Sequence, residues 1–329
     1  MDNPQRVTVV IPNWNGEKYI GECLGALASQ TLGGQRVIVI DNASRDGSRE
    51  IIKNNHPDVE LIESSANEGF ARAVNKGIRA ADTEFVALLN NDAVPDPDWL
   101  EKAVAALDSN HGFDSVACKI VFYDDPKTID SAGDEYAPWG AVSNRGRGQR
   151  DGGDYNLPAR VFGPCAAAAL YRKSLFDEIG LFDENFFAYY EDTDLNLRAA
   201  LAGRKCFYAP GAKVRHRYSA STSGKARKLG VEEVYIHLTG VAVKGLPLGA
   251  AAFLRAAIFH GAILFFFVLA RLRKRNRLPS VPLIKFMSAM LAQRSATAGA
   301  ARVTAVELRR LFRAELLTAD TVARGDGDV

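Results

Sequence analysis

The sequence has few of the features that mark secreted, disulfide-rich or nucleic-acid-binding proteins. Its 329 residues include only four cysteines, which are widely scattered and form no Cys-x-x-Cys pair (Cys23, Cys118, Cys165 and Cys206). We therefore expect reduced, mostly buried thiols instead of disulfides or a zinc site. The formal net charge of +2 gives no general case for binding nucleic acid. The first residues lack a basic and apolar signal segment, so we expect that the chain is not secreted.

Internal repeats and low-complexity tracts are also absent from the sequence. The hydrophobic content of 47% and the charged content of 24% are ordinary for a globular protein, so most of the chain should fold. The length suits one large domain or one domain with an extension. Because the composition changes near residue 245, we predict two regions. The first is a globular domain over residues 1–225, and the second is a helical C-terminal region over residues 226–329.

The C-terminal region contains a hydrophobic segment, residues 245–270, followed by a basic cluster, residues 271–277. A helix needs about 20 apolar residues to span a bilayer, and this segment reaches that length only by burying Arg255 and His260. A helix that lies in the membrane interface or is re-entrant fits better than a clean span. The basic cluster suits an anionic inner leaflet. A buried helix with a solvated basic end is the alternative.

Short apolar runs that end in polar turn residues predict buried parallel strands, because helical patterns follow several of them. The predicted strands cover residues 7–11, 37–40, 59–63, 85–89 and 205–208. The fold class that this pattern indicates is α/β, with a mostly parallel central sheet flanked by helices. Residues 123–158 are rich in Gly, Asp and Arg, and we predict a long surface excursion there.

Proline, asparagine or aspartate residues follow three of these strands where each one ends. They are Pro12, Asn13 and Asn15 after the first strand, Asp41 after the second, and Asn90, Asn91 and Asp92 after the fourth. The carboxyl ends of parallel strands meet at one edge of a sheet, where open α/β sheets bind ligands. Because Mg²⁺ is often held by one or two carboxylates and by substrate phosphates, Asp92 suits a metal ion that bridges a diphosphate. The pattern therefore favours a nucleotide-sugar site, although Asn90–Asp92 also suits a plain polar turn.

Four residues have both a chemical and a structural interpretation. Asp41 can accept the imide N–H of uracil or thymine, or it can form an Asx turn. Glu191 and Asp192 begin a predicted helix, where acidic residues commonly complement the helix dipole. The aromatic run Phe186–Tyr190 could also shield this pair and raise a carboxyl pKa, which makes Asp192 the candidate general base. His216, predicted to follow the last strand, could complete a metal site with Asp92 or be structural.

Taken in order, these segments resemble bacterial glycosyltransferase family 2, whose members have the GT-A fold, and most of all its rhamnosyltransferase-like branch. The resemblance covers residues 6–222. It rests on Val9–Gly16 (VVIPNWNG), Val39–Ser44 (VIDNAS), Asn67–Asn75 (NEGFARAVN), Leu88–Asp92 (LLNND), Gly163–Cys165 (GPC), Tyr190–Leu195 (YEDTDL) and His216.

The resemblance implies a role for each matching residue. It assigns the nucleoside to Pro12, Asn13, Asn15 and Asp41, with Asn67 and Asn75 nearby. The roles of Asn90 and Asn91, as neutral hydrogen-bond partners for ribose or phosphate, follow from their place beside Asp92 and not from the resemblance. The resemblance implies that Asp92 binds a divalent cation, Mg²⁺ or Mn²⁺, and that His216 reaches the metal or the diphosphate. It makes Asp192 the general base and Glu191 the residue that orients the acceptor or the base. The metal motif departs from the family pattern, because Asn-Asn-Asp replaces two aspartates.

The activity implied by the resemblance is inverting transfer of a sugar, with rhamnose the first candidate, from a dTDP- or UDP-sugar to a saccharide acceptor. The hydrophobic and basic C-terminal region favours a lipid-linked acceptor in cell-wall or surface polysaccharide synthesis. The expected location is the cytoplasmic face of the inner membrane, with peripheral or monotopic attachment. No nucleic-acid partner is expected.

Two alternatives stay open. A sugar-1-phosphate nucleotidyltransferase would share the sheet and the metal, but it normally begins with a Gly-rich phosphate loop that bears Arg or Lys, unlike Pro12–Gly16. A non-catalytic glycan-binding or scaffold protein on the same fold is the second alternative.

Overall fold

A computed structural model describes residues 5–136, 142–217 and 315–316 of the chain. The strands are β1 (Val7–Asn13), β2 (Arg36–Asp41), β3 (Glu60–Glu63), β4 (Phe85–Leu89), β5 (Ala93–Pro95), β6 (Ser115–Phe122), β7 (Ile129–Ser131), β8 (Asp134–Tyr136), β9 (Val142–Asn144), β10 (Ala159–Val161), β11 (Ala168–Arg172), β12 (Cys206–His216) and β13 (Glu315–Leu316). The helices are α1 (Ile20–Ala28), α2 (Ser48–Asn55), α3 (Phe70–Ala80), α4 (Trp99–Ser109), α5 (Lys173–Ile179) and α6 (Glu191–Leu201), with a 3₁₀ turn η1 (Gly153–Asn156).

The central sheet runs in the order β13-β10-β12-β6-β11-β4-β1-β2-β3, with β5 paired to β12 and β7 paired to β6. The strands β3, β2, β1 and β4 are parallel throughout, as the sequence predicted for them. The strands β6 and β12 are also parallel, but β11 lies between β4 and β6 and runs antiparallel to both. The carboxyl ends of β1, β2 and β4 therefore share one edge, and the sheet beyond β4 is mixed.

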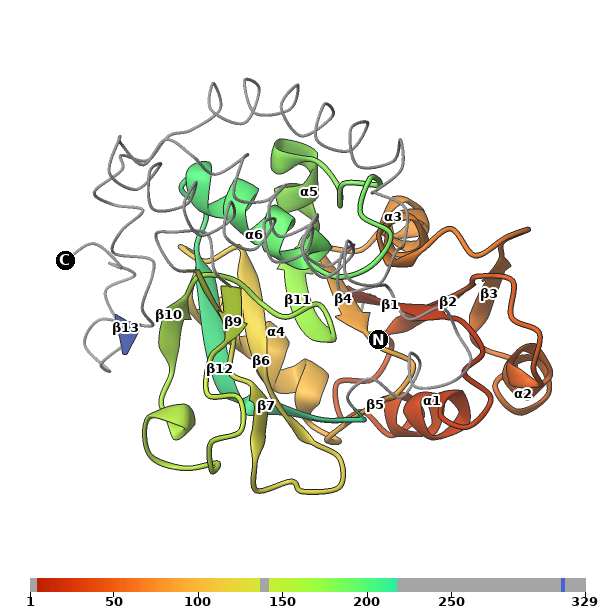
Figure 1. The fold of residues 1–329 in the computed structure, drawn as a ribbon, viewed down its shortest axis with the longest axis horizontal. Coiled ribbons are helices and arrows are strands. Elements are labelled where there is room, and N and C mark those ends of the chain that lie inside the picture. The colour runs from red at the N-terminus through yellow and green to blue at the C-terminus, as the bar shows by residue number, and fades with distance from the viewer. Residues whose placement is uncertain (1–4, 137–141, 218–314, 317–329) are drawn as a thin grey trace, which may run out of the picture.

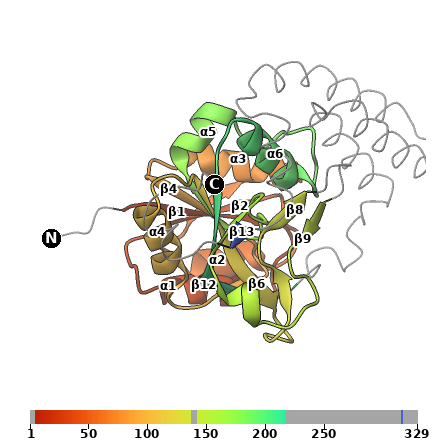
Figure 2. The same ribbon diagram turned by 90° about the vertical axis from the view of Figure 1, so that its left-hand side faces the viewer.

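Helices cover both faces of this sheet. In Figure 1 and in the turned view of Figure 2, α3, α5 and α6 lie on one side of the sheet, and α1, α2 and α4 lie on the other. Alternation along β1 explains why both faces are apolar, since successive side chains of a strand point to opposite faces. Val9 and Ile11 pack with α1 and α4, whereas Val10 packs with α3. The result is a sheet buried on both faces, which is typical of parallel α/β structure.

The last long strand extends further than the sequence predicted. We expected a strand over residues 205–208 with His216 beyond its end, but β12 continues to His216, so that placement was wrong. The register of β12 against β6 shifts between Ala209 and Lys213, and this bulge accommodates Pro210. His216 consequently pairs with Phe122 on β6 and with Ala93 on β5.

The Gly-rich excursion is also more ordered than predicted. Residues 123–158 contain β7, β8, β9 and η1, and several of their side chains are buried, including those of Ile129, Asp130 and Asp134. Gly133, at φ 95°, lets this segment approach Val161, because a Cβ atom there would lie 2.8 Å from Val161 Cγ2. The guanidinium of Arg145 lies 5.1 Å from the ring centre of Tyr208. The prediction of a plain surface excursion was therefore wrong for these residues.

The predicted C-terminal features fall almost wholly outside the described residues. The hydrophobic segment 245–270 and the basic cluster 271–277 both do so, and of the predicted region 226–329 only Glu315 and Leu316 are described, as β13 paired with β10. Among the helices of the described ranges, none combines the length and hydropathy needed to traverse a bilayer.

Candidate active site

The first group of predicted site residues lies where β1 and β2 end. Asn13 and Asp41 are opposite each other in the parallel register, and both are buried. Asn13 Nδ2 donates to Asp41 Oδ1 at 2.9 Å, and the Ser44 amide donates to Asp41 Oδ2 at 2.9 Å. The second of these bonds spans three residues, one more than the Asx turn that the sequence allowed. Both carboxylate oxygens thus accept hydrogen bonds from the protein itself, which orients Asp41 rigidly at the sheet edge.

Asn13 connects this group to the fourth strand. Its Oδ1 atom accepts a hydrogen bond of 2.7 Å from Asn91 Nδ2, and its Nδ2 atom lies 3.1 Å from Ser48 Oγ. Gly16 is required beside this bond, because a Cβ atom there would lie 2.2 Å from Asn13 Oδ1 and 2.3 Å from Asn91 Nδ2. The predicted residues Asn13, Asp41 and Asn91 are therefore brought together in one network.

The turn after β1 is held in an unusual conformation. Asn15 has a φ of 51°, which is uncommon for a residue other than glycine but tolerated by Asn. Its amide donates to Ser44 Oγ at 2.9 Å, and its Oδ1 atom accepts from the Arg45 amide at 2.9 Å. Pro12 is half-buried in β1, opposite Ile40. These contacts fix the loop that would face a nucleoside.

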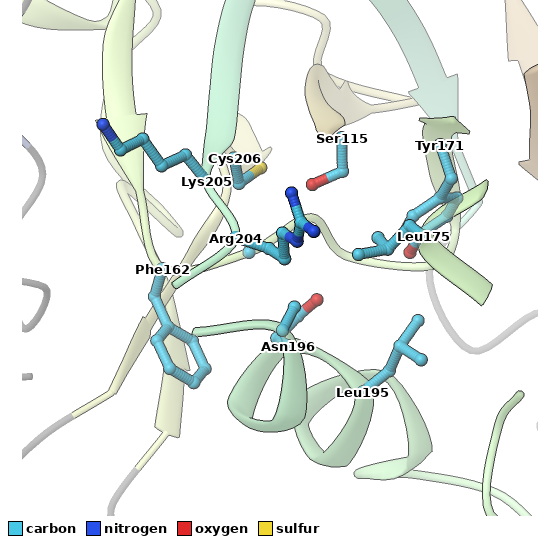
Figure 3. A pocket seen from close by; sticks show the side chains of 11 residues that line it. Ser115, Phe162, Tyr171, Leu175, Leu195, Asn196, Arg204, Lys205 and Cys206 are labelled. Atoms are coloured by element: carbon cyan, nitrogen blue, oxygen red, sulfur yellow. The ribbon is translucent and has the colours of Figure 1, made fainter. Parts of the chain in front are cut away.

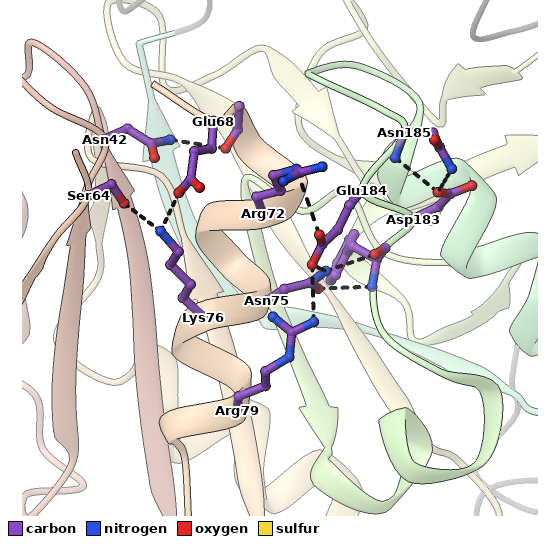
Figure 4. A network of polar contacts seen from close by, with 12 residues as sticks. Asn42, Ser64, Glu68, Arg72, Asn75, Lys76, Arg79, Asp183, Glu184 and Asn185 are labelled. Atoms are coloured by element: carbon purple, nitrogen blue, oxygen red, sulfur yellow. Dashed lines mark hydrogen bonds and ion pairs between the residues drawn. The ribbon is translucent and has the colours of Figure 1, made fainter. Parts of the chain in front are cut away.

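Asn67 and Asn75 lie apart from this network. Asn67 Oδ1 accepts from the Gly69 amide at 3.0 Å, just before α3. Figure 4 shows Asn75 reaching from α3 to the segment before α6, where it donates to Phe182 O at 2.8 Å and accepts from the Phe182 amide at 3.0 Å. Glu184 in the same segment forms an ion pair with Arg79 at 3.0 Å. The described contacts of Asn75 hold the approach to α6 and do not reach the β1–β2 edge.

The second group of predicted residues surrounds Asp92. Asp92 is 1% exposed, and its Oδ1 atom lies 3.3 Å from His216 Nε2. Asn90 Nδ2 also lies 3.3 Å from His216 Nε2. On the other side of the ring, His216 Nδ1 lies 2.8 Å from Asp130 Oδ2. Burial lowers the pKa of His216, but the carboxylates of Asp130 and Asp92 outweigh burial and raise it to about 9.

The Asp92–His216 pair fits a divalent cation by its donor chemistry and spacing. Neighbouring ligands of an octahedral ion with bonds near 2.1 Å lie about 3 Å apart, close to the observed separation. The part of the chain that the structure describes has no cluster of three or more His, Cys, Asp or Glu suited to a metal ion. A cation held here would take its other ligands from water and substrate phosphates, as Mg²⁺ commonly does.

The third group is the acidic pair at the start of α6. Glu191 is 6% exposed, and burial raises its pKa well above the usual range, with the Asp192 charge adding to the effect. Asp192 is half-buried and accepts hydrogen bonds from the amides of Thr193 at 2.7 Å and Ala166 at 3.2 Å. Burial raises the pKa of Asp192, and these amide bonds oppose that rise. The pair therefore consists of one oriented carboxyl group and one deeply buried neighbour.

The turn that holds Asp192 also touches the Asp92 strand. The Ala166 amide binds Asp192, and the next carbonyl, Ala167 O, accepts from the Asn90 amide at 3.0 Å. The metal-binding candidate and the candidate base are thus attached to the two sides of one short turn. This connection, which the sequence did not show, brings the second and third groups together.

Several residues that support the site were missed by sequence reasoning. Asp130, Asp134 and Asn196 are all buried. Asn196 Nδ2 donates to Asp134 Oδ2 at 3.1 Å and to Pro164 O at 3.0 Å, which braces the turn before Ala166. The strand β7 is only three residues long, Ile129–Ser131, and its adjacent polar residues Asp130 and Ser131 give no alternation that could have marked it.

A cavity lies between α6 and the sheet, away from these groups. Ser115, Tyr171, Leu195, Asn196, Arg204 and Cys206 are among its lining residues (Figure 3). Gly163 and Asn196 connect it with the braced turn, and none of the predicted site residues lines it. The candidate site is therefore the sheet edge itself and not this cavity.

The fold of the chain is shared with solved glycosyltransferase structures. The mannosyltransferase PcManGT from Pyrobaculum calidifontis, solved with GDP-Man and Mn²⁺, matches with a TM-score of 0.51 and 20% identity over 90% of this chain and 88% of that one. TarS 1–349 from S. aureus matches with a TM-score of 0.51 and 18% identity over 98% of this chain and 92% of that one. At these identities the similarity shows the fold alone, a GT-A-like α/β fold.

The sequence comparisons then define the family. The profile of Glycosyl transferase family 2 matches residues 8–180, more than half of the 329-residue chain, and the chain belongs to this family. The chain is 33% identical to Glycosyltransferase AglE of Haloferax volcanii over 121 residues, 35% of this chain and 40% of that protein. It is 30% identical to the N-acetylglucosaminyl-diphospho-decaprenol L-rhamnosyltransferase of Mycobacterium tuberculosis over 227 residues, 60% of this chain and 72% of that enzyme. The match with AglE spans less than half of that relative's length.

Proposed function

We propose that this protein is an inverting glycosyltransferase that moves a sugar from a nucleoside-diphosphate donor to a saccharide acceptor. The observation that carries the proposal is the turn at Ala166–Ala167, which hydrogen-bonds both the strand end of Asp92 and the carboxyl group of Asp192. A transferase of this kind needs a site for the departing diphosphate beside a base for the acceptor. Family membership and the fold support the same conclusion.

The donor would bind along the carboxyl ends of β1, β2 and β4. Asp41, held by Asn13 and Ser44, presents an ordered carboxylate to a pyrimidine base. Asn15, in the turn after β1, would complete the nucleoside side of the site, whereas Asn75 would hold the segment before α6. Asp92 and His216 would hold Mg²⁺ or Mn²⁺. When bound, such a cation neutralises charge that develops on the diphosphate as it leaves.

Asp192 would accept the proton of the attacking acceptor hydroxyl. The amides of Ala166 and Thr193 orient its carboxylate, and burial raises its pKa, which brings it closer to the working pH of a general base. Attack by the acceptor oxygen on the anomeric carbon forms the glycosidic bond as the bond to the diphosphate breaks. A single displacement of this kind inverts the anomeric configuration.

The substrates follow from the relatives. One relative is named as an L-rhamnosyltransferase that acts on N-acetylglucosaminyl-diphospho-decaprenol. This similarity supports dTDP-rhamnose as donor and a lipid-linked saccharide as acceptor. UDP-sugars are the second donor class. A role in cell-wall or surface polysaccharide synthesis at the cytoplasmic face of the inner membrane accords with the hydrophobic and basic segments of residues 245–277. The family match does not favour a nucleotidyltransferase or a non-catalytic glycan-binding protein.

A thermal-shift panel of UDP-, dTDP- and GDP-sugars, each with and without Mg²⁺ or Mn²⁺, tests the proposal. A ligand at 100 times its dissociation constant stabilises the folded state by about 2.7 kcal/mol. We expect a cation-dependent increase in melting temperature with one nucleotide class. We also expect turnover, with an inverted anomeric configuration of the product as determined by NMR. The control variant Asp92→Asn should lose the cation-dependent part of the shift. Absence of any donor-induced shift in the parent protein would contradict the proposal.

A further inference from the structure

The residue of interest is Asp130, a buried carboxylate in the excursion between β6 and β9. Its Oδ2 atom lies 2.8 Å from His216 Nδ1, although the two residues are 86 positions apart in the chain. Asp130 is 5% exposed, and its Oδ1 atom lies 3.5 Å from the Arg147 guanidinium. The contact with His216 is therefore a buried, charge-assisted hydrogen bond and not an incidental surface contact.

The backbone directs Asp130 toward His216. Ile129 on β7 pairs with Val121 on β6, but the next pair joins Ser131 to Ile120, so Asp130 is the extra residue of a bulge. A bulge of this type changes the direction of a side chain, and bulges are frequent next to active sites. His216 is paired with Phe122 on the other side of β6. The bulge thus allows a β7 carboxylate to reach across the end of β6 to a β12 side chain.

The contact also determines which ring nitrogen of His216 can bind a metal ion. A carboxylate accepts hydrogen bonds, so the neutral imidazole beside Asp130 has its N–H at Nδ1. The lone pair is then at Nε2, the atom that lies 3.3 Å from Asp92 Oδ1. Metal-binding histidines commonly donate their other N–H to a carboxylate in this way, and loss of that partner typically weakens metal binding by 10- to 100-fold.

We propose that Asp130 is a positioning residue that fixes the orientation and tautomer of His216, so that Nε2 and Asp92 together bind the divalent cation. This inference rests on the proposed function, because it requires His216 to be a metal ligand. The inference gives residues 123–158 a structural role at the site that the sequence did not indicate. The segment supplies the support for one metal ligand from outside the parallel half of the sheet.

The test is calorimetric titration of Mn²⁺ into the full-length protein at a fixed excess of UDP, repeated with dTDP. We expect Asp130→Asn to weaken Mn²⁺ binding by about 10- to 100-fold. Asp151→Asn is the matched control, since Asp151 is a half-buried carboxylate in the same segment that pairs with Lys119 and Lys213 and not with His216. Its Mn²⁺ affinity should stay within about twofold of the parent value.

A double variant separates positioning from a general structural role. If Asp130 acts through His216, then Asp130→Asn should have almost no further effect on Mn²⁺ affinity in a His216→Ala background. Equal losses in both backgrounds would overturn the inference. Unchanged Mn²⁺ affinity in His216→Ala would instead contradict the proposed metal role of His216 itself. A parent protein that binds no Mn²⁺ with either nucleotide would contradict both the metal role of His216 and the positioning role of Asp130.

Nitrogen-15 NMR of the histidine rings gives a readout that does not depend on the stability of a variant. In the parent protein with Mg²⁺ and the nucleotide that supports binding, His216 should carry its proton on Nδ1 and none on Nε2. The chain has five histidines, so His216→Ala suffices to assign the signal. A proton on Nε2 in the Mg²⁺-loaded protein would overturn the inference.

Discussion

The β1–β2 edge and the start of α6 differ in how completely their buried carboxyl oxygens are hydrogen-bonded. At the β1–β2 edge, Asp41 accepts one hydrogen bond on each carboxylate oxygen, from Asn13 and from the Ser44 amide. At the start of α6, Glu191 Oε2 is buried and accepts no hydrogen bond from the described residues. Burial raises the pKa of both Glu191 and Asp192.

The difference accords with the proposed roles of the two regions, donor binding at the β1–β2 edge and proton transfer at the start of α6. Polar groups that satisfy each other lose little when a ligand arrives, because they are already ordered, and such preorganisation favours affinity. A carboxyl group that is buried without a cationic partner is less stable when ionised, and this is how proteins bring a base toward neutral pH. We therefore expect substitutions at the β1–β2 edge to change stability and donor binding, and substitutions at α6 to change the chemical step.

The largest expected effect is the loss of transfer in Asp192→Asn. The amide cannot accept the hydroxyl proton, and a positioned base contributes about 10²–10⁴-fold to the rate. Donor affinity, measured by thermal shift, should stay within about twofold of the parent value. A large loss of donor affinity with a small loss of rate would instead make Asp192 a binding residue and erase the contrast between the two regions.

The second effect is a loss of stability in Asn13→Ala. The substitution removes the hydrogen bonds that Asn13 makes with Asp41 Oδ1, Ser48 Oγ and Asn91 Nδ2, and each buried group left unsatisfied costs about 1–3 kcal/mol. We expect a decrease of about 3 kcal/mol in the free energy of unfolding, measured by urea denaturation. Asn185→Ala, at an exposed position, is the control and should stay within about 0.5 kcal/mol of the parent. Equal effects of the two substitutions would show that the Asn13 network adds no stability.

The third effect is expected in Gly163→Ala, at the braced turn before Ala166. A Cβ atom there would lie 2.0 Å from Asn196 Cγ, so Asn196 must move away from Asp134 and Pro164. Overpacking of this kind costs about 1–3 kcal/mol, and we also expect kcat to fall more than donor affinity, because the turn holds Asp192. Gly25→Ala makes the same change in α1 where nothing lies within 4 Å of the new atom, and it should be neutral or stabilising. An unchanged kcat in Gly163→Ala would mean that the brace is not needed for catalysis.

The two regions also differ in how far the sequence could predict them. The positions of Asn13, Asp41 and Asp92 at strand ends follow from local patterns, because an apolar run and the polar turn after it are neighbours in the chain. The strand β4 was predicted with its bounds, Phe85–Leu89, for the same reason. Parallel register then brought Asn13 and Asp41 opposite each other, as the α/β pattern required.

The residues that hold His216 and the turn beside Asp192 could not be predicted from local sequence patterns. Asp130 meets His216 across 86 residues, and Asn196 meets Asp134 across 62 residues. Neither contact leaves a periodic signal, because it depends on a bulge or a turn and not on a repeating pattern. The strand β11 was missed for a different reason. It begins with two alanines, a residue depleted in strands, and only its position between β4 and β6 makes it a strand.

The smallest expected effect is a gain of stability in Glu191→Gln. The pKa of Glu191 is raised in the folded protein, so this group favours folding fully below about pH 4.5, the unfolded value, and that contribution is lost as the pH rises through the folded pKa. At pH 7.5 the neutral amide should therefore be more stable than the parent by about 1 kcal/mol. The helix dipole favours a negative charge at this position by about 0.3–1 kcal/mol, which keeps the gain small.

Urea denaturation of the parent and Glu191→Gln at pH 7.5 and at pH 4 measures this effect. The difference in unfolding free energy should shrink toward the lower pH, because both the folded and the unfolded parent then carry a protonated Glu191. An exposed substitution, Glu50→Gln near the start of α2, should show no such dependence beyond a few tenths of a kcal/mol. A variant that is less stable than the parent at pH 7.5 would mean that the folded protein stabilises the Glu191 carboxylate. In that case the start of α6 would resemble the satisfied β1–β2 edge, and the contrast between binding and reactive regions would rest on Asp192 alone.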